Sequence, residues 1–177
     1  MQPMNILLLT ADADRVGVAL CVAHRETHCA LEGEVTTSGE STLVVLREPR
    51  GPELHCAELP GTYLADGLSA LLAWLTTRNI RVDLVTHRIA QHGTDENFLR
   101  LSPAQLGILE GFASCKDALP CVQAVSAWNQ ATPQFVYFSV RPHTPESLVS
   151  VIAGSGAQPP AGCPKKMKVR CETCSAS

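Results

Sequence analysis

The sequence has few charged residues, few aromatic residues and no long apolar segment, and these scarcities exclude several classes of protein. Charged residues are 18% and aromatic residues 5% of the chain, and the formal net charge is −3, so no overall positive field favours nucleic acid. No apolar run approaches the roughly 20 residues of a membrane-spanning helix, and the first residues lack the basic segment of a secretory signal peptide. We therefore expect a cytoplasmic protein that binds neither nucleic acid nor membrane. The 45% of hydrophobic residues predicts one domain with a sizeable core.

Eight cysteines are present, and in a cytoplasmic protein they are more often thiols than disulfides. Five of them are scattered and are expected to be small buried side chains: Cys21, Cys29, Cys56, Cys115 and Cys121. The other three lie in 153–177, a Gly- and Pro-rich linker followed by a Cys- and Lys-rich tail, which predicts no fixed structure. Their spacing, from Cys163 to Cys174, is open to two interpretations: a flexible thiol tail, or a metal site that still needs a fourth ligand.

Apolar patterns predict strands in the first part of the chain, over 4–10, 15–22 and 41–46. The first two are separated by a hairpin-sized gap, so they are expected to pair antiparallel. The segment 34–39 is polar and predicts a loop, and 48–60 contains Pro and Gly and predicts irregular structure.

Helices and strands then alternate. Leucines recur on one helical face over 62–77, at Leu64, Leu68, Leu71, Leu72 and Leu75. Further elements are expected at 80–88 (strand, followed by a turn at His92–Gly93), from Ser102 (helix), and at 119–128 (helix), 134–140 (strand) and 144–151 (short helix). Ser102, Pro103 and Gln105 have the pattern of a helix start with a capping box. Together these elements predict an α/β fold with a mixed five-stranded sheet and flanking helices.

Three segments carry recognisable motifs. MNILLLTADADRVGVAL at 4–20 has the layout of a strand, a turn and a second strand. THRIAQHG at 86–93 is similar to Gly-His-Arg-Val-Val-His-Gly-Gly, and 101–138 runs helix, loop, helix, strand. With these segments, residues 1–152 resemble the N-terminal domain of the acetate kinase (acetokinase) family, the ATP-dependent carboxylate kinases. The resemblance implies the ribonuclease H-like fold of the sugar kinase, actin and Hsp70 superfamily.

The resemblance also implies roles for single residues. Arg88 corresponds to the substrate-binding arginine, whose guanidinium can bind carboxylate oxygens and neutralise a phosphoryl group in transfer. A structural ion pair at a strand end is the alternative role. His87 corresponds to a second substrate-binding residue, and His143 corresponds to a further catalytic side chain. A short-chain carboxylate, ATP and Mg²⁺ are the ligands that the resemblance implies.

The departures from the family pattern fall on the phosphate chemistry. The phosphate turn becomes Thr10, Asp12, Asp14 and Arg15, and two carboxylates in a turn without glycine repel phosphate. Asp12 could still bind Mg²⁺, and a solvated hairpin turn is the alternative interpretation. The catalytic acid of the family falls on Ser139, which cannot carry its charge.

The resemblance covers one domain of a two-domain enzyme, and phosphoryl transfer needs both walls of a cleft. We therefore expect a single-domain form that is inactive alone. Two other hypotheses stay open. A separate chain could complete a working carboxylate kinase, or the exposed cleft face could belong to an interaction module, including a homodimer.

Overall fold

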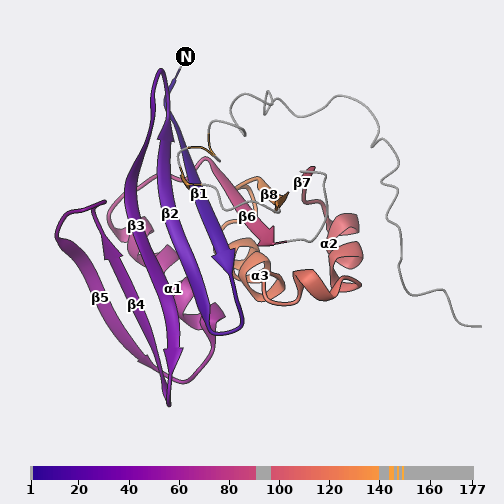
Figure 1. The fold of residues 1–177 in the computed structure, drawn as a ribbon, viewed down its shortest axis with the longest axis horizontal. Coiled ribbons are helices and arrows are strands. Elements are labelled where there is room, and N and C mark those ends of the chain that lie inside the picture. Colours follow the sequence, from indigo (N-terminus) through magenta and orange to yellow (C-terminus); the bar gives the residue numbers. More distant parts are fainter. Residues whose placement is uncertain (1, 91–96, 140–143, 146, 148, 150–177) are drawn as a thin grey trace, which may run out of the picture.

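A computed structural model describes residues 2–90, 97–139, 144, 145, 147 and 149 of the 177. One eight-stranded sheet runs through the molecule in the order β5-β4-β3-β2-β1-β6-β8-β7 (Figure 1). The strands are β1 (Met4–Ala11), β2 (Arg15–Ala23), β3 (Thr27–Ser38), β4 (Ser41–Arg47), β5 (Glu53–Pro60), β6 (Leu84–Ala90), β7 (Asn97–Arg100) and β8 (Gln134–Ser139). The helices are α1 (Leu64–Thr77), α2 (Pro103–Glu110) and α3 (Leu119–Trp128), with a 3₁₀ turn η1 at Ala113–Cys115.

The topology confirms the predicted change from hairpins to crossovers. Strands β1 to β5 form an antiparallel meander. Strand β6 then joins β1 in parallel, and β8 joins β6 in parallel. The short β7 closes the far edge antiparallel to β8. The carboxyl ends of the three parallel strands β1, β6 and β8 therefore meet at one edge of the sheet, where α/β proteins place their ligands.

The predicted count of five strands is wrong, because three strands lack the pattern of a half-buried strand. Strand β3 covers the predicted loop 34–39. A β-bulge breaks its pairing with β2, so its apolar side chains do not alternate regularly. Strand β5 lies inside the predicted irregular segment 48–60 and is an edge strand with exposed glutamates, a composition that protects sheet edges. Strand β7 has four residues, too few to give a pattern.

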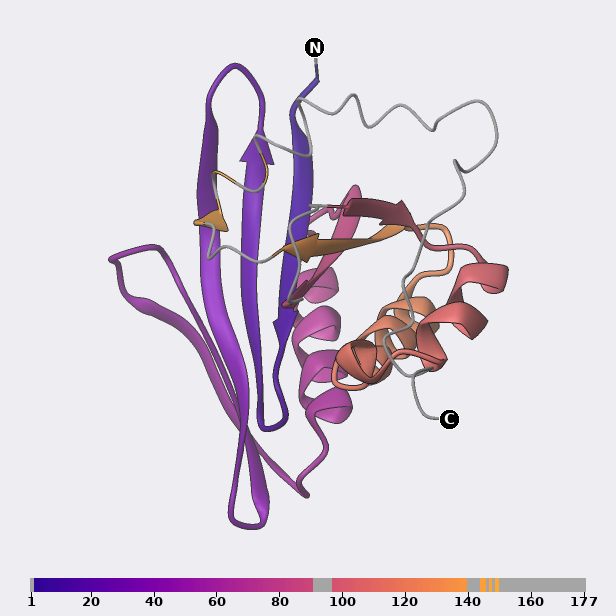
Figure 2. The same cartoon turned by 45° about the vertical axis from the view of Figure 1, so that its right-hand side comes forward.

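Helices α1 and α3 cover one face of the sheet and contact each other (Figures 1 and 2). We call this the helix face. The leucines predicted to face inward from α1 are buried, at 1% exposure or less for four of the five: Leu68, Leu71, Leu72 and Leu75. A hydrogen bond links the two helices: Trp128 Nε1 of α3 donates to Thr76 Oγ1 of α1 at 2.9 Å. Burial of this amphipathic face gives α1 most of its stability.

Gly67 allows α1 to lie close to the sheet. A Cβ at this position would stand 2.4 Å from Val35 Cγ1 and 2.7 Å from Thr42 Cγ2, closer than real carbon atoms approach each other. The glycine is buried within α1. The helix therefore packs on β3 and β4 at a separation that no other residue permits.

The predicted helix boundaries are largely confirmed. Asn79, with φ of 55°, follows the end of α1. Ser102 Oγ accepts from the backbone N–H of Gln105 at 3.4 Å, and the Gln105 side chain accepts from the N–H of Ser102 at 2.9 Å, which is the predicted capping box. Strand β6 begins at Leu84 rather than at 80. The predicted turn at His92–Gly93 and the tail 153–177 lie outside the described residues, as does most of the predicted helix 144–151.

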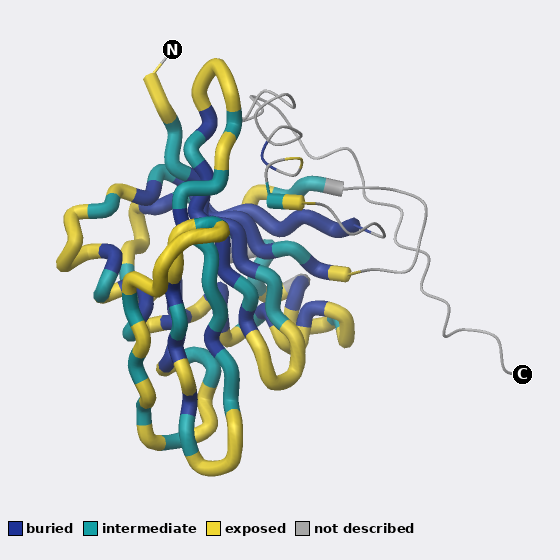
Figure 3. The backbone as a smooth tube through the Cα atoms, turned by 60° about the vertical axis from the view of Figure 1, so that its left-hand side comes forward, coloured by how far each residue is buried: buried dark blue, intermediate teal, exposed yellow. Residues whose placement is uncertain are grey.

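The other face of the sheet, which we call the open face, carries a second apolar cluster over its central strands. Its members come from β1, β2, β6 and β8, with Val149 packed among them: Ile6, Leu8, Ala19, Cys21, Ala23, Leu84, Phe135 and Tyr137. Figure 3 shows buried residues gathered in the central strands and exposed residues at the hairpin ends. None of the helices described is long and apolar enough to cross a membrane.

Candidate functional site

Strand alternation separates the two residues of the His87–Arg88 motif onto opposite faces of the sheet. Val85 and Ile89 belong to the apolar clusters of the helix face, so His87 points the same way. Thr86 and Arg88 point to the open face. A single strand end therefore supplies a buried imidazole on one side and a partly exposed guanidinium on the other.

Arg88 lines a pocket of about 340 Å³ on the open face. The register sets Arg88 beside Thr10, Thr10 beside Gly17, and Gly17 beside Glu34. This cross-strand row forms the floor of the pocket near the carboxyl ends of β1 and β6. Gly17 has no side chain to fill the pocket. The space above it is free, because an added Cβ would meet only Thr10 atoms, at 3.8 Å or more.

Ion pairs on strands β2, β3 and β4 form the far wall of the pocket. Arg15 Nε lies 2.9 Å from Glu34 Oε2, and Arg47 Nε lies 2.9 Å from Glu32 Oε1. These side chains are more than one third exposed, so solvent screens both pairs. With Arg88 included, the pocket lining carries one more positive than negative charge, a balance that suits a ligand with a single negative charge.

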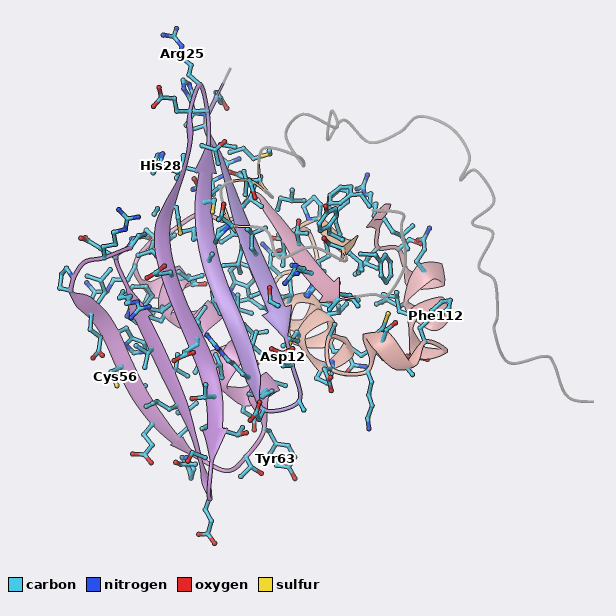
Figure 4. The ribbon with its side chains drawn as sticks, viewed as in Figure 1. Asp12, Arg25, His28, Cys56, Tyr63 and Phe112 are labelled. Atoms are coloured by element: carbon cyan, nitrogen blue, oxygen red, sulfur yellow. The ribbon has the colours of Figure 1, made fainter. Side chains whose placement is uncertain are left out.

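The β1–β2 turn, predicted as a degenerate phosphate turn, is a closed hairpin turn. The Asp12 N–H donates to the Arg15 carbonyl at 2.8 Å, and the Asp14 carbonyl accepts from the Thr37 N–H at 3.0 Å. Asp12 and Asp14 are exposed, and Figure 4 shows Asp12 at the end of β1, beside this turn. A phosphate chain would meet two carboxylates, and the N–H of Asp12 is already used within the turn. These residues do not fit a nucleotide polyphosphate.

The same turn supplies little for Mg²⁺. Within the part of the chain that the structure describes, no group of three or more His, Cys, Asp or Glu side chains is arranged to hold a metal ion. Among the described residues, Asp12, the candidate metal ligand, therefore has no carboxylates or imidazoles suitably arranged around it.

His87 is 1% exposed and is held by a hydrogen-bonded network on the helix face. Its Nε2 lies 2.8 Å from Gln134 Oε1. The amide nitrogen of Gln134 donates to Ser126 Oγ of α3 at 2.8 Å, so the amide oxygen faces the imidazole and Nε2 is the protonated nitrogen. Burial lowers the pKa of His87 from 6.5 to about 4, against the raising effect of the Gln134 hydrogen bond. His87 is therefore neutral at pH 7.

The remaining candidates lie at the same sheet edge or outside the described chain. Ser139 ends β8, is 1% exposed and pairs in register with Ala90. Its position on β8 places it on the open face, the same face as Arg88. His143 lies outside the described residues. Sequence reasoning missed Glu32, Glu34 and Arg47, because the β3 glutamates were assigned to a loop or left unassigned. Glutamates two residues apart were the signal that they share one face of a strand.

Thr86 is a further residue that sequence reasoning did not select. It is 0% exposed, and its hydroxyl has no hydrogen-bond partner within the described structure. It lies two residues before Arg88 on the same face of β6. A buried hydroxyl without a partner destabilises a fold. Thr86 is therefore a polar group beside Arg88 that stability alone does not explain.

Three solved structures that share this arrangement of strands and helices are two acetate kinases and a propionate kinase. Acetate kinase from Porphyromonas gingivalis matches with a TM-score of 0.61 at 16% sequence identity, over 85% of this chain and 43% of the kinase. The chain has the fold of part of an acetate kinase. A propionate kinase from Francisella tularensis subsp. tularensis SCHU S4 gives a TM-score of 0.61 at 15% identity, and an acetate kinase from Entamoeba histolytica gives 0.58 at 12%. Both of these matches cover 76% of this chain and 36% of the kinase.

The likeness to acetate kinases is structural and partial. No family model and no curated protein matches the sequence, and the chain spans less than half the length of the kinases above. The shared architecture confirms the predicted ribonuclease H-like fold class. Because a fold does not determine an activity, the function has to be argued from the site itself.

Proposed function

We propose that this chain is a carboxylate-binding domain with an acetate kinase fold that transfers no phosphoryl group on its own. The observation that carries the proposal is the place of Arg88, which lines an open-face pocket near the carboxyl ends of β1 and β6. The guanidinium fork matches a carboxylate in geometry and charge. The pocket lining has an excess of one positive charge, which favours a short monocarboxylate such as acetate or propionate over a polyanion.

The loss of transfer activity follows from the phosphate side of the site. Asp12 and Asp14 stand in the turn where the family resemblance implies phosphate and Mg²⁺, and both carboxylates oppose a polyphosphate. Ser139 stands where the resemblance implies a catalytic acid and supplies no negative charge. ATP and Mg²⁺ are therefore not ligands of this chain alone under the proposal.

His87 acts in this proposal as a positioning residue rather than as a ligand of the carboxylate. Its ring is buried on the helix face and hydrogen-bonded to Gln134, so it holds the end of β6 in place from the face opposite the pocket. Arg88, next along the strand, is then presented to the open face in one orientation. His143 would join the site only from the segment that follows β8.

A second candidate function is a carboxylate kinase completed by a separate chain. The match to less than half of each kinase favours it, because a second wall could bring the nucleotide pocket and phosphate contacts that this turn does not offer. A non-catalytic interaction module, homodimeric or paired with a companion chain, is the remaining alternative. In both alternatives, the open face would contact a second protein chain.

The test measures carboxylate binding and acyl-phosphate formation on the same purified chain. Acetate, propionate and butyrate are titrated by NMR, with Arg88→Ala, Arg88→Lys and the control Arg25→Ala. Arg25 lies at the tip of the β2–β3 hairpin, far from Asp12 at the other end of β2 (Figure 4). Loss of a charged hydrogen-bond pair worth about 1.5–3 kcal/mol weakens binding roughly 10- to 150-fold. Arg88→Lys retains the charge without the fork and is expected to fall between wild type and Arg88→Ala.

The outcomes separate the candidates. Binding that weakens in Arg88→Ala and not in Arg25→Ala, without hydroxamate-trapped acyl phosphate from Mg-ATP, supports the proposal. Turnover by the wild-type chain that is lost in Arg88→Ala would show that it is a kinase by itself. Equal binding by all the variants, or none by the wild type, would refute the carboxylate site.

A further inference from the structure

Cys21 and Cys29 are cross-strand partners at a β-bulge. The pairing of β2 with β3 sets Leu20 opposite Leu31 and then Cys21 opposite Cys29, so Ala30 is the extra residue of the bulge. Partners in an antiparallel pair have Cα atoms about 4.5–5.5 Å apart. That separation lies within the range of roughly 4.4–6.8 Å that a disulfide bridges.

The two thiols also share one environment. Cys21 belongs to the open-face apolar cluster and is 0% exposed, and Cys29 packs against the same cluster while it stays partly exposed. The Cys29 thiol donates to the Leu31 carbonyl at 3.1 Å, across the bulged residue. Cys29 is thus the more accessible residue of the pair, and its cross-strand partner Cys21 is fully buried.

We propose that Cys21 and Cys29 form a reversible disulfide, a redox modification site separate from the Arg88 pocket. The oxidant is a low-molecular-weight disulfide of the glutathione class. The Cys29 thiolate attacks one oxidant sulfur, which breaks the S–S bond, releases one thiol and leaves a mixed disulfide on Cys29. The Cys21 thiolate then attacks Cys29 Sγ and expels the second thiol. The protein dithiol is oxidised by two electrons, and the oxidant takes both electrons and both protons.

The other described cysteines lack this combination of access and partner. Burial raises the pKa of Cys121 to about 11, with Asp117 adding to the effect, and burial also raises the pKa of Cys115. Neither therefore offers an external oxidant an accessible thiolate for the first exchange. Cys56, which was expected to be buried, is exposed on the edge strand β5. Its register partner is Val45, so it can take up glutathione but has no cross-strand thiol among the described residues to complete a disulfide.

The experiment maps disulfides in the folded full-length chain after incubation with oxidised glutathione and alkylation of the remaining thiols. Trypsin cuts after Arg15, Arg25 and Arg47, which places Cys21 on peptide 16–25 and Cys29 on peptide 26–47. We expect these two peptides joined, with the loss of two hydrogen atoms and no bound glutathione. The joined pair should disappear on reduction and in Cys29→Ser, and it should persist in Cys56→Ser. Closure of this short loop should raise the Tm by about 5 °C.

The results decide the proposal without reference to carboxylate binding. A joined 16–25/26–47 pair that depends on Cys29 supports it. Glutathione retained on Cys29 beside an unmodified Cys21 would overturn it, because the second exchange would then have failed. Both thiols alkylated after oxidation, in a chain shown to be folded by circular dichroism, would overturn it equally.

Discussion

Acidification should destabilise this protein through His87, by an amount that follows from its burial. The pKa is 6.5 for an exposed imidazole and about 4 in the folded chain, so the unfolded state binds the proton more readily. Stability from this group is complete above pH 6.5 and is lost as the pH falls from 6.5 towards 4. Each pKa unit corresponds to about 1.4 kcal/mol, so the total is about 3 kcal/mol. Roughly 2 kcal/mol of it is lost between pH 7 and pH 5.

Urea unfolding at pH 7 and pH 5, followed by circular dichroism, measures this loss. Carboxylates titrate over part of the same range, so the informative quantity is the difference between wild type and His87→Gln at each pH. The glutamine amide can still donate to Gln134, and it does not titrate. Between pH 7 and pH 5, the wild type should therefore lose about 2 kcal/mol more of its free energy of unfolding than His87→Gln loses.

The matched control is His28→Gln, at an exposed histidine on β3. This variant should follow the wild-type pH dependence. The reasoning would be refuted if His87→Gln kept the full wild-type slope. An imidazole resonance of His87 that titrates near pH 6.5 in the folded protein would refute it directly.

Other substitutions test the packing around the site, each by urea unfolding. Gly67→Ala should lose about 1–2 kcal/mol, because overpacking against Val35 outweighs the gain in helix propensity. Gly107→Ala, in α2 with no atom within 4 Å of the added Cβ, should instead gain about 0.5–1 kcal/mol, and equal effects of the two changes would contradict the close approach of α1. Gln134→Leu should cost about 1–3 kcal/mol, since it leaves the buried imidazole N–H of His87 without its acceptor. Arg47→Ala should change stability by less than about 1 kcal/mol, because its ion pair is exposed, and a larger loss would mean that the pocket wall is a structural element.

Sequence patterns predicted the buried elements well and the edges poorly. The helix at 119–128, the leucine face of α1 and the capping box at Ser102 all depend on local spacing, and the structure confirms them. The prediction missed strands β3 and β5, because a strand near a sheet edge needs neither two apolar faces nor regular alternation of apolar and polar residues. Their assignment depends on neighbours far away in the chain.

The candidate site divides in the same way. The motif at 86–93 selected Arg88 as a candidate substrate-binding residue, with a structural ion pair at the strand end as the alternative, and Arg88 lies in the pocket lining. It also grouped His87 with Arg88, as adjacent letters suggest. The pleat of β6 places the two on opposite faces, so only one of them reaches the pocket. The glutamates of the far wall come from β3, which the sequence did not identify as a strand there.

The sequence by itself determined the α/β class, the antiparallel start followed by parallel crossovers, and the chemical character of the β1–β2 turn. These follow from hydrophobic period, turn length and charge, which act over a few residues. Tertiary structure alone decided the number of strands, the face on which each side chain of β6 lies, and the pairing of Cys21 with Cys29. The physical reason is that strand register and sheet order are set by hydrogen bonds and packing between segments distant in sequence, and no local pattern encodes them.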